Sequence, residues 1–192
     1  MAILRFPPNN RLTAVTSTCD SVDEALDWFK DEVGESTVDA AGIDAPLSWA
    51  TGRAGWRSMD IYLRKRYRPV QRSVLSINSA AGSMVVQGMA VALKLKKIWK
   101  GIRLNETHPK VLYYALTGHS YKYGQPMVRC LLGRFTPPLT VPITNEHEWD
   151  ALFSAWATWQ GLDGGWANNL MKEAKGLLFP AGPVSYFWPP DE

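Results

Sequence analysis

The chain has 192 residues, of which 46% are apolar and 20% are charged, and its formal net charge is +3. This length favours one domain, residues 1–192, over two independently folded ones. No apolar run approaches the roughly 20 residues of a membrane helix and the amino terminus lacks signal-peptide features, so we expect a cytoplasmic protein without membrane contact. Cys19 and Cys130 lack a metal-binding spacing and are expected to be reduced thiols.

Alternating apolar and polar residues predict strands, and apolar side chains at three- and four-residue spacing predict helices. In chain order, the elements are a hairpin of strands 2–6 and 11–16, a helix capped by Ser21 that ends at Gly34, a strand over 38–43, helices over 56–67 and 81–100, a strand over 103–106, a helix capped by Asn145 that ends near Gly161, and a strand over 184–188. This order predicts a mixed α/β domain. Residues 117–145 are rich in Gly and Pro, and we expect them to cover one edge of the core.

Charge is unevenly distributed along the chain. Residues 51–103 contain twelve Lys or Arg and one acid, whereas residues 1–50 contain three and nine and residues 104–192 contain six and eight. A segment of net charge +11 predicts a polyanionic partner, either nucleic acid or another phosphodiester. The alternative is a pair of solvated helices whose charge serves solubility.

Three acidic segments predict a carboxylate cluster at one edge of the sheet. Residues 42–47 and 105–109 each place a carboxylate at the end of an apolar run that proline stops, and residues 146–151 open a long apolar helix. Like charges held close together repel one another unless a cation or shared protons offset them. The usual reason for such a cluster is a hard metal ion, for which carboxylate oxygens are the preferred ligands.

The order of these segments resembles the DUF429 family of predicted nucleases, which is assigned to the ribonuclease H-like superfamily. The matching segments are Gly-Ile-Asp-Ala-Pro-Leu at 42–47, an Arg-rich segment with Arg57 and Asp60, Glu-Thr-His-Pro at 106–109, Asp-Ala-Leu-Phe-Ser-Ala-Trp-Ala at 150–157, and an aromatic strand before Pro189. The resemblance covers nearly the whole chain. It implies a ribonuclease H-like mixed sheet flanked by helices, and a metal-dependent nuclease or phosphodiesterase.

Position by position, the resemblance assigns Asp44, Glu106 and Asp150 to a catalytic site that binds Mg²⁺ or Mn²⁺. Each has an alternative: Asp44 as a turn cap, Glu106 as an exposed strand end paired with a lysine, and Asp150 as a first-turn acid favoured by the helix dipole. His108 lies two residues after Glu106, on the same face of an extended strand. It could be a metal ligand, a catalytic general acid or base, or a hydrogen-bonded histidine at a strand end.

The basic segment supplies four candidate substrate-binding side chains: Arg53, Arg57, Asp60 and Arg64. The last three are spaced to fall on one side of a helix, from which an arginine facing the acidic site could hold a scissile phosphate with two hydrogen bonds. The alternative is a surface ion network among these three side chains, which would contribute little to stability.

The chain departs from the ribonuclease H-like pattern at its start. Such domains begin with a central strand that carries a metal-binding aspartate, whereas this chain opens on what resembles the second strand and has no acid before Asp20. We therefore expect the fold to lack a strand between residues 2–6 and 38–43. Either upstream residues, another segment or a second copy in an oligomer fills the gap, or the protein is a catalytically degenerate module that binds nucleic acid or a protein partner.

Overall fold

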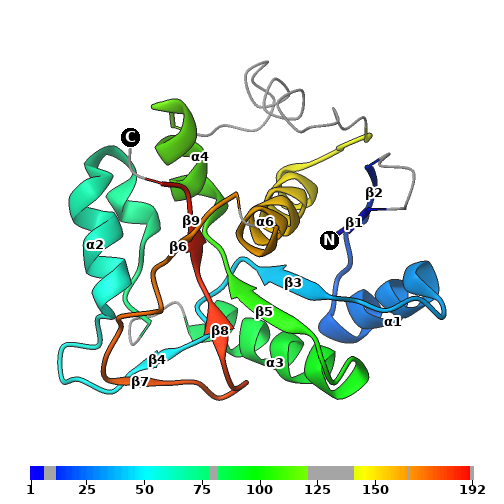
Figure 1. Cartoon of the computed structure of the whole chain (residues 1–192), viewed down its shortest axis with the longest axis horizontal. Helices are drawn as coiled ribbons and strands as arrows, with labels where there is room; N and C mark the ends of the chain where they lie inside the picture. The colour runs from blue at the N-terminus through cyan, green and yellow to red at the C-terminus, as the bar shows by residue number, and fades with distance from the viewer. Residues whose placement is uncertain (7–11, 78–81, 121–140, 164, 191–192) are drawn as a thin grey trace.

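The computed structural model describes residues 1–6, 12–77, 82–120, 141–163 and 165–190 (Figure 1). Its strands are β1 (Ala2–Arg5), β2 (Thr13–Thr16), β3 (Ala40–Ile43), β4 (Trp49–Ala50), β5 (Arg103–Glu106), β6 (Asn168–Asn169), β7 (Leu177–Leu178), β8 (Val184–Ser185) and β9 (Phe187–Trp188). Its helices are α1 (Val22–Val33), α2 (Ser58–Arg66), the 3-10 helix η1 (Arg68–Ser73), α3 (Gly82–Ile98), α4 (Pro109–Thr117) and α6 (Glu146–Leu162). The fold is mixed α/β, with helices around small sheets that are partly parallel. None of the described helices is long and apolar enough to cross a membrane.

A parallel sheet in the order β3-β5-β8 lies between helices α6 and α3 (Figure 1). Two glycines allow these helices to approach the β3 segment closely. A Cβ atom on Gly42 would lie 2.3 Å from the carbonyl oxygen of Ser154 in α6, and one on Gly88 in α3 would lie 2.4 Å from the Cβ of Ala45. Because side chains alternate between the faces of a strand, Gly42 faces α6 whereas Ile43 faces α3.

Strand β5 shows the same division of its two faces. The Asn105 side-chain amide donates to Thr158 Oγ1 at 3.0 Å, and Thr107 Oγ1 donates to Ser154 Oγ at 2.8 Å. Asn105 and Thr107 therefore face α6. Glu106, which lies between them in the sequence, points to the opposite face of the sheet.

Most of the predicted elements are confirmed. The hairpin pairs Ala2 with Thr16, and its turn residues lie outside the described part of the chain. Ser21 accepts a hydrogen bond from the Glu24 amide at the start of α1, as Asn145 does from the Glu148 amide at the start of α6. Residues 121–140 of the predicted irregular stretch lie outside the described residues.

Other elements were missed or are divided differently. Helix α4 follows β5 directly, with Pro109 at its first position and Gly118 in the left-handed conformation at its end. Both residues are ordinary boundary signals for a helix. The predicted strand over residues 184–188 is two short strands, β8 and β9, which pair with β5 and β6 respectively.

The amino-terminal hairpin does not join the parallel sheet within the described residues. Strand β1 pairs with β2, and β3 pairs with β5, but β1 and β3 are not paired with each other. Helix α6 packs against both β1 and β3. The hairpin and the sheet are therefore held side by side through α6, with their facing edges separated.

Candidate functional site

Glu106 lies in a buried ion-pair cluster rather than in an open site. Its carboxylate accepts hydrogen bonds from Arg57 Nη1 at 2.7 Å, from Arg57 Nη2 at 2.6 Å and from the Leu47 amide at 2.8 Å. Arg57 also donates to both carboxylate oxygens of Asp60, at 2.8 and 2.7 Å, and to Ser48 Oγ at 3.1 Å. The guanidinium is thus shared between two carboxylates, and both oxygens of Glu106 are occupied.

This cluster changes the roles expected for three residues. Arg57, Asp60 and Glu106 are 3%, 2% and 2% exposed, so none of them reaches a substrate at the surface. The alternative of a surface ion network is also wrong, as is that of an exposed Glu106 paired with a lysine. Burial alone would lower the pKa of Arg57, but the two carboxylates raise it above its ordinary value. Arg57 is therefore a permanent buried cation. Burial raises the pKa of Glu106, and the charge and hydrogen bonds of Arg57 oppose that rise.

The other two basic candidates lie apart from this cluster. Arg64 Nη1 donates to the carbonyl oxygens of Gln71 and Val74, at 2.8 and 2.7 Å, and its guanidinium lies 4.9 Å from the ring centre of Trp56. These contacts tie the η1 segment to α2. Arg53 is exposed and remains available to a ligand.

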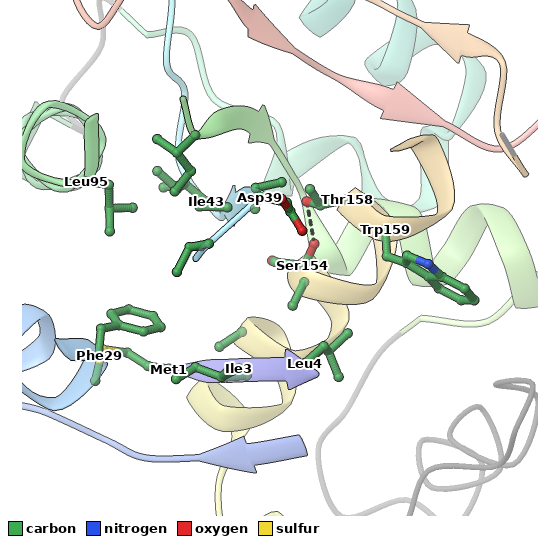
Figure 2. Close-up of a pocket in the computed structure, with 18 of the residues that line it drawn as sticks. Met1, Ile3, Leu4, Phe29, Asp39, Ile43, Leu95, Ser154, Thr158 and Trp159 are labelled. Carbon is green, nitrogen blue, oxygen red and sulfur yellow. Dashed lines mark hydrogen bonds between the residues drawn. The ribbon is translucent and has the colours of Figure 1, made fainter. Parts of the chain in front are cut away.

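Asp44 and Asp150 lie on the α6 face of the sheet. Asp44 follows Gly42 by two residues along the strand, and Asp150 precedes Ser154 by one helical turn, so the contact between Gly42 and Ser154 places the two aspartates near each other. Both line one cavity of about 860 Å³ between the hairpin and β3. Figure 2 shows this cavity, with Ser154 and Ile43 on its wall.

The two aspartates are electrostatically linked and difficult to ionise together. Burial raises the pKa of Asp44 to about 7, although its side chain still meets the water of the cavity. Burial, with the added repulsion of Asp44, also raises the pKa of Asp150 to about 7. Lys110 lowers both pKa values in part, but its ammonium is paired with Glu146 at 2.9 Å. Oδ1 of Asp150 is buried and has no hydrogen-bond partner among the described residues.

His108 has the strand-end role that was the alternative to catalysis. Its Nε2 lies 3.0 Å from the carbonyl oxygen of Ser73, and because a carbonyl can only accept, this nitrogen carries the proton. Burial lowers the pKa of His108, which favours the neutral ring. The histidine therefore connects the start of α4 to the end of η1.

The structure brings together two of the three predicted carboxylates and separates the third. Asp44 and Asp150 share the α6 face, whereas Glu106 points to the other face and binds Arg57. In the described ranges, no group of three or more His, Cys, Asp or Glu side chains is placed to hold a metal ion. The predicted cluster of three carboxylates is therefore not assembled by these residues.

Sequence reasoning missed two features of the site. Lys110 and Glu146 form the ion pair beside the two aspartates, and Asn105, the residue before Glu106, is buried between α6 and the Phe187 amide. The ion pair joins α4 to α6, and Asn105 joins β5 to α6 and β9, so both depend on how elements far apart in the sequence pack together. No protein-family model, curated protein or solved structure matches the chain.

Proposed function

We propose that the protein is a metal-dependent nuclease or phosphodiesterase of ribonuclease H-like fold, similar to the DUF429 family, in which Asp44 and Asp150 bind Mg²⁺ or Mn²⁺. The observation that supports this proposal is the linked pair of aspartates at one cavity, with a carboxylate oxygen of Asp150 buried and without a partner. Burial raises the pKa of both aspartates, and neighbouring carboxylates add to it, Glu106 at Asp44 and Asp44 at Asp150. A divalent cation would offset these effects and would occupy that oxygen.

The residues present fit such an ion in their donor chemistry. Mg²⁺ is commonly held by only one or two carboxylates, and water and substrate phosphate oxygens complete its coordination. Asp44 and Asp150 supply two carboxylates. Glu106 does not contribute, because its two oxygens already accept from Arg57.

A divalent cation held by Asp44 and Asp150 would supply an activated water molecule and polarise a phosphoryl oxygen. The protein's own groups prepare the site for that chemistry. The Leu47 amide donates to Glu106, and the Ser48 carbonyl oxygen accepts from Arg57 at 3.4 Å, so the buried cluster fixes the segment that follows Asp44. Lys110 is held beside the aspartates by Glu146, where its ammonium attracts a phosphate.

The surface of α2 and η1 supports a phosphodiester substrate. Five basic side chains are exposed along this part of the chain: Arg53, Lys65, Arg66, Arg68 and Arg72. Lys and Arg contacts to phosphates release bound counterions, which gives binding that weakens steeply with added salt. These residues, rather than buried Arg57 and Asp60, carry the proposed substrate-binding role together with half-buried Arg64.

Metal titration tests the proposal directly. Mn²⁺ binding should be measured calorimetrically for the parent chain and for Asp44→Asn and Asp150→Asn, with the exposed Asp31→Asn as a matched control. We expect both site variants to lose Mn²⁺ binding and metal-dependent cleavage of single-stranded RNA or DNA, while the control retains both. Unchanged Mn²⁺ binding in the site variants would assign the metal elsewhere.

The incomplete carboxylate cluster favours a second candidate function. Because Glu106 is on the other face of the sheet, the protein can also be a catalytically degenerate module that binds nucleic acid through α2 and η1. This candidate predicts salt-sensitive binding of single-stranded RNA that is the same with Mn²⁺ and with a chelator. The enzyme predicts cleavage that the chelator abolishes.

A further inference from the structure

A recess on the outer surface of α2 and η1 is separate from the cavity that holds the two aspartates. It has a volume of about 500 Å³, and its lining residues are Trp56, Ile61, Arg64, Lys65, Arg68 and Gln71. None of these residues lines the aspartate cavity, and Figure 1 shows α2 on the side of the fold opposite the hairpin of β1 and β2. Sites for small ligands commonly have volumes of roughly 300–1,000 Å³. The recess is therefore large enough for part of a ligand to enter.

The spacing of residues along α2 gives the recess one continuous wall. Ile61, Arg64 and Lys65 are three and four residues apart, so they lie on one face of the helix. Arg68 follows at the start of η1. Ile61 is 40% exposed, and Lys65 and Arg68 are exposed as well. This wall thus presents one apolar side chain and three cations to the same space.

Trp56 provides an aromatic wall, and its backbone is held on both sides. The carbonyl oxygen of Gly55 accepts a hydrogen bond from Ser76 Oγ at 2.8 Å. On the other side, Arg57 is buried in its ion pair with Glu106. The indole of Trp56 is half-buried, so part of its surface is open to the recess. A ring that is already fixed in place loses little conformational entropy when a ligand packs on it.

The guanidinium of Arg64 is fixed beside this indole and keeps unused donors. It lies 4.9 Å from the ring centre of Trp56, and its Nη1 donates to the carbonyl oxygens of Gln71 and Val74. Among the described residues, no group accepts a hydrogen bond from its Nε or Nη2. Nucleic acid bases stack on arginine guanidinium planes as well as on aromatic rings. Trp56 and Arg64 together therefore form a stacking surface with free hydrogen-bond donors at its edge.

The charge around the recess favours an anionic ligand. Asp60 is the only acid between residues 51 and 103, and it is buried in the ion-pair cluster. Lys65 and Arg68 line the recess, and exposed cations continue along η1 to Arg72. An aromatic ring beside a row of cations suits an unpaired nucleotide, whose base stacks on the ring while its phosphates contact the cations. A base inside a duplex does not offer its face in this way, because it is stacked between its neighbours.

We propose that this recess is the stacking site for one unpaired base of a single-stranded nucleic acid. The inference rests on the nucleic-acid part of the proposed function, to which it adds the requirement for an unpaired base. The base packs on Trp56 and Arg64, and Lys65 and Arg68 hold the neighbouring phosphates. Exposed cations beyond the recess favour a continuous strand over a free nucleotide. The site does not depend on whether the aspartate pair binds a metal ion.

Two oligomers of equal length and charge test the role of the base: oligothymidylate, and the same backbone in which every nucleotide is abasic. Binding should be measured by fluorescence anisotropy at low salt with a chelator present, so that metal-dependent cleavage does not contribute. We expect the parent to bind the base-bearing strand roughly tenfold more tightly than the abasic strand. Equal affinities, with salt-sensitive binding of both strands, would overturn the stacking site but leave the proposed phosphate-binding surface in place.

Variants of two tryptophans locate the stacking surface. Trp56→Ala should bind both oligomers as the parent binds the abasic one, with the parent's salt dependence, because it removes a stacking surface but no phosphate contact. Its binding to a duplex should equal that of the parent. Trp49→Ala is the matched control, because Trp49 is 36% exposed but does not line the recess, and it should keep the parent's preference. Loss of the preference in Trp49→Ala alone would overturn the proposal.

Photochemical crosslinking of the parent chain tests the same contact without a substitution that could impair folding. A single strand that carries bromouridine should be irradiated in the complex, and the modified residue should be identified by mass spectrometry. We expect the crosslink at Trp56. Crosslinks at other residues only would overturn the proposal. If neither oligomer bound at low salt, the nucleic-acid part of the proposed function would be wrong, and the stacking site with it.

Discussion

The clearest test of the aspartate pair is the dependence of stability on pH. Asp150 ionises near pH 7 in the folded protein, with a pKa of about 7, but near pH 3.9 when unfolded. Between these values the folded state binds more protons than the unfolded state, so stability falls as pH rises from about 4 to about 7. At a pH below the unfolded pKa the aspartate pair causes no loss of stability, and at a pH above the folded pKa the loss of stability is complete.

The size of this loss follows from the shift in pKa. A rise of about 3 units at Asp150 corresponds to roughly 4 kcal/mol at 1.36 kcal/mol per unit. Asp44 meets the water of the cavity, which screens the pair, so we expect about 2 kcal/mol in practice. Asp150→Asn removes one charge and should therefore be more stable than the parent at pH 8 by about this amount, and equal to it near pH 4.

Urea unfolding of the parent and of Asp150→Asn across this pH range measures the difference directly. Asp31→Asn, an exposed aspartate on α1, is the control and should follow the parent at every pH. Added Mn²⁺ should restore stability to the parent at pH 8 but not to Asp150→Asn, because a bound cation replaces the missing protons. Parallel curves for the parent and Asp150→Asn would refute the reasoning, since the two carboxyls would then ionise independently of folding.

Three further perturbations test the rest of the structure. Arg57→Ala leaves two buried carboxylates without their counter-ion and should destabilise the protein by about 3–5 kcal/mol in urea unfolding, whereas a loss under 1 kcal/mol would place the cluster at the surface. Gly42→Ala drives a Cβ against the Ser154 carbonyl oxygen and should cost about 1–3 kcal/mol, while Gly52→Ala, with no atom within 4 Å of its added Cβ, is the control. Three exposed basic side chains should be replaced with glutamine: Lys65, Arg66 and Arg68. The affinity for RNA should then depend less steeply on salt concentration, whereas an unchanged dependence would mean that these residues serve solubility only.

The elements with local signals could be predicted from the sequence. The caps at Ser21 and Asn145 act on amides three residues away, so both helix starts are encoded in a few neighbouring residues. Helix α4 has such signals too, in Pro109 and Gly118. Its start was missed because the N-cap residue, His108, is not a usual capping residue and makes no side-chain capping hydrogen bond.

The site was only half predictable because its geometry depends on long-range pairing. The sequence located the end of strand 103–106 but not the face to which Glu106 points. That face is set by the contacts of Asn105 and Thr107 with α6, about fifty residues further along the chain. Arg57 was identified as important, yet its partner Glu106 lies 49 residues away, and no local pattern distinguishes a buried ion pair from a surface one.

Glu106 and Asp44 can now be given different roles that one experiment separates. Glu106 holds the Leu47 amide at 2.8 Å, and so positions the segment after Asp44 from the opposite face of the sheet. Glu106→Gln should therefore speed hydrogen exchange at Leu47 and weaken Mn²⁺ binding in proportion, because a neutral amide is a weaker acceptor and leaves Arg57 undercompensated. Asp44→Asn should abolish Mn²⁺ binding while Leu47 exchange stays at the parent rate. If Glu106→Gln abolished Mn²⁺ binding with Leu47 still protected, Glu106 would be a ligand after all, and the buried ion pair would have to open when the metal binds.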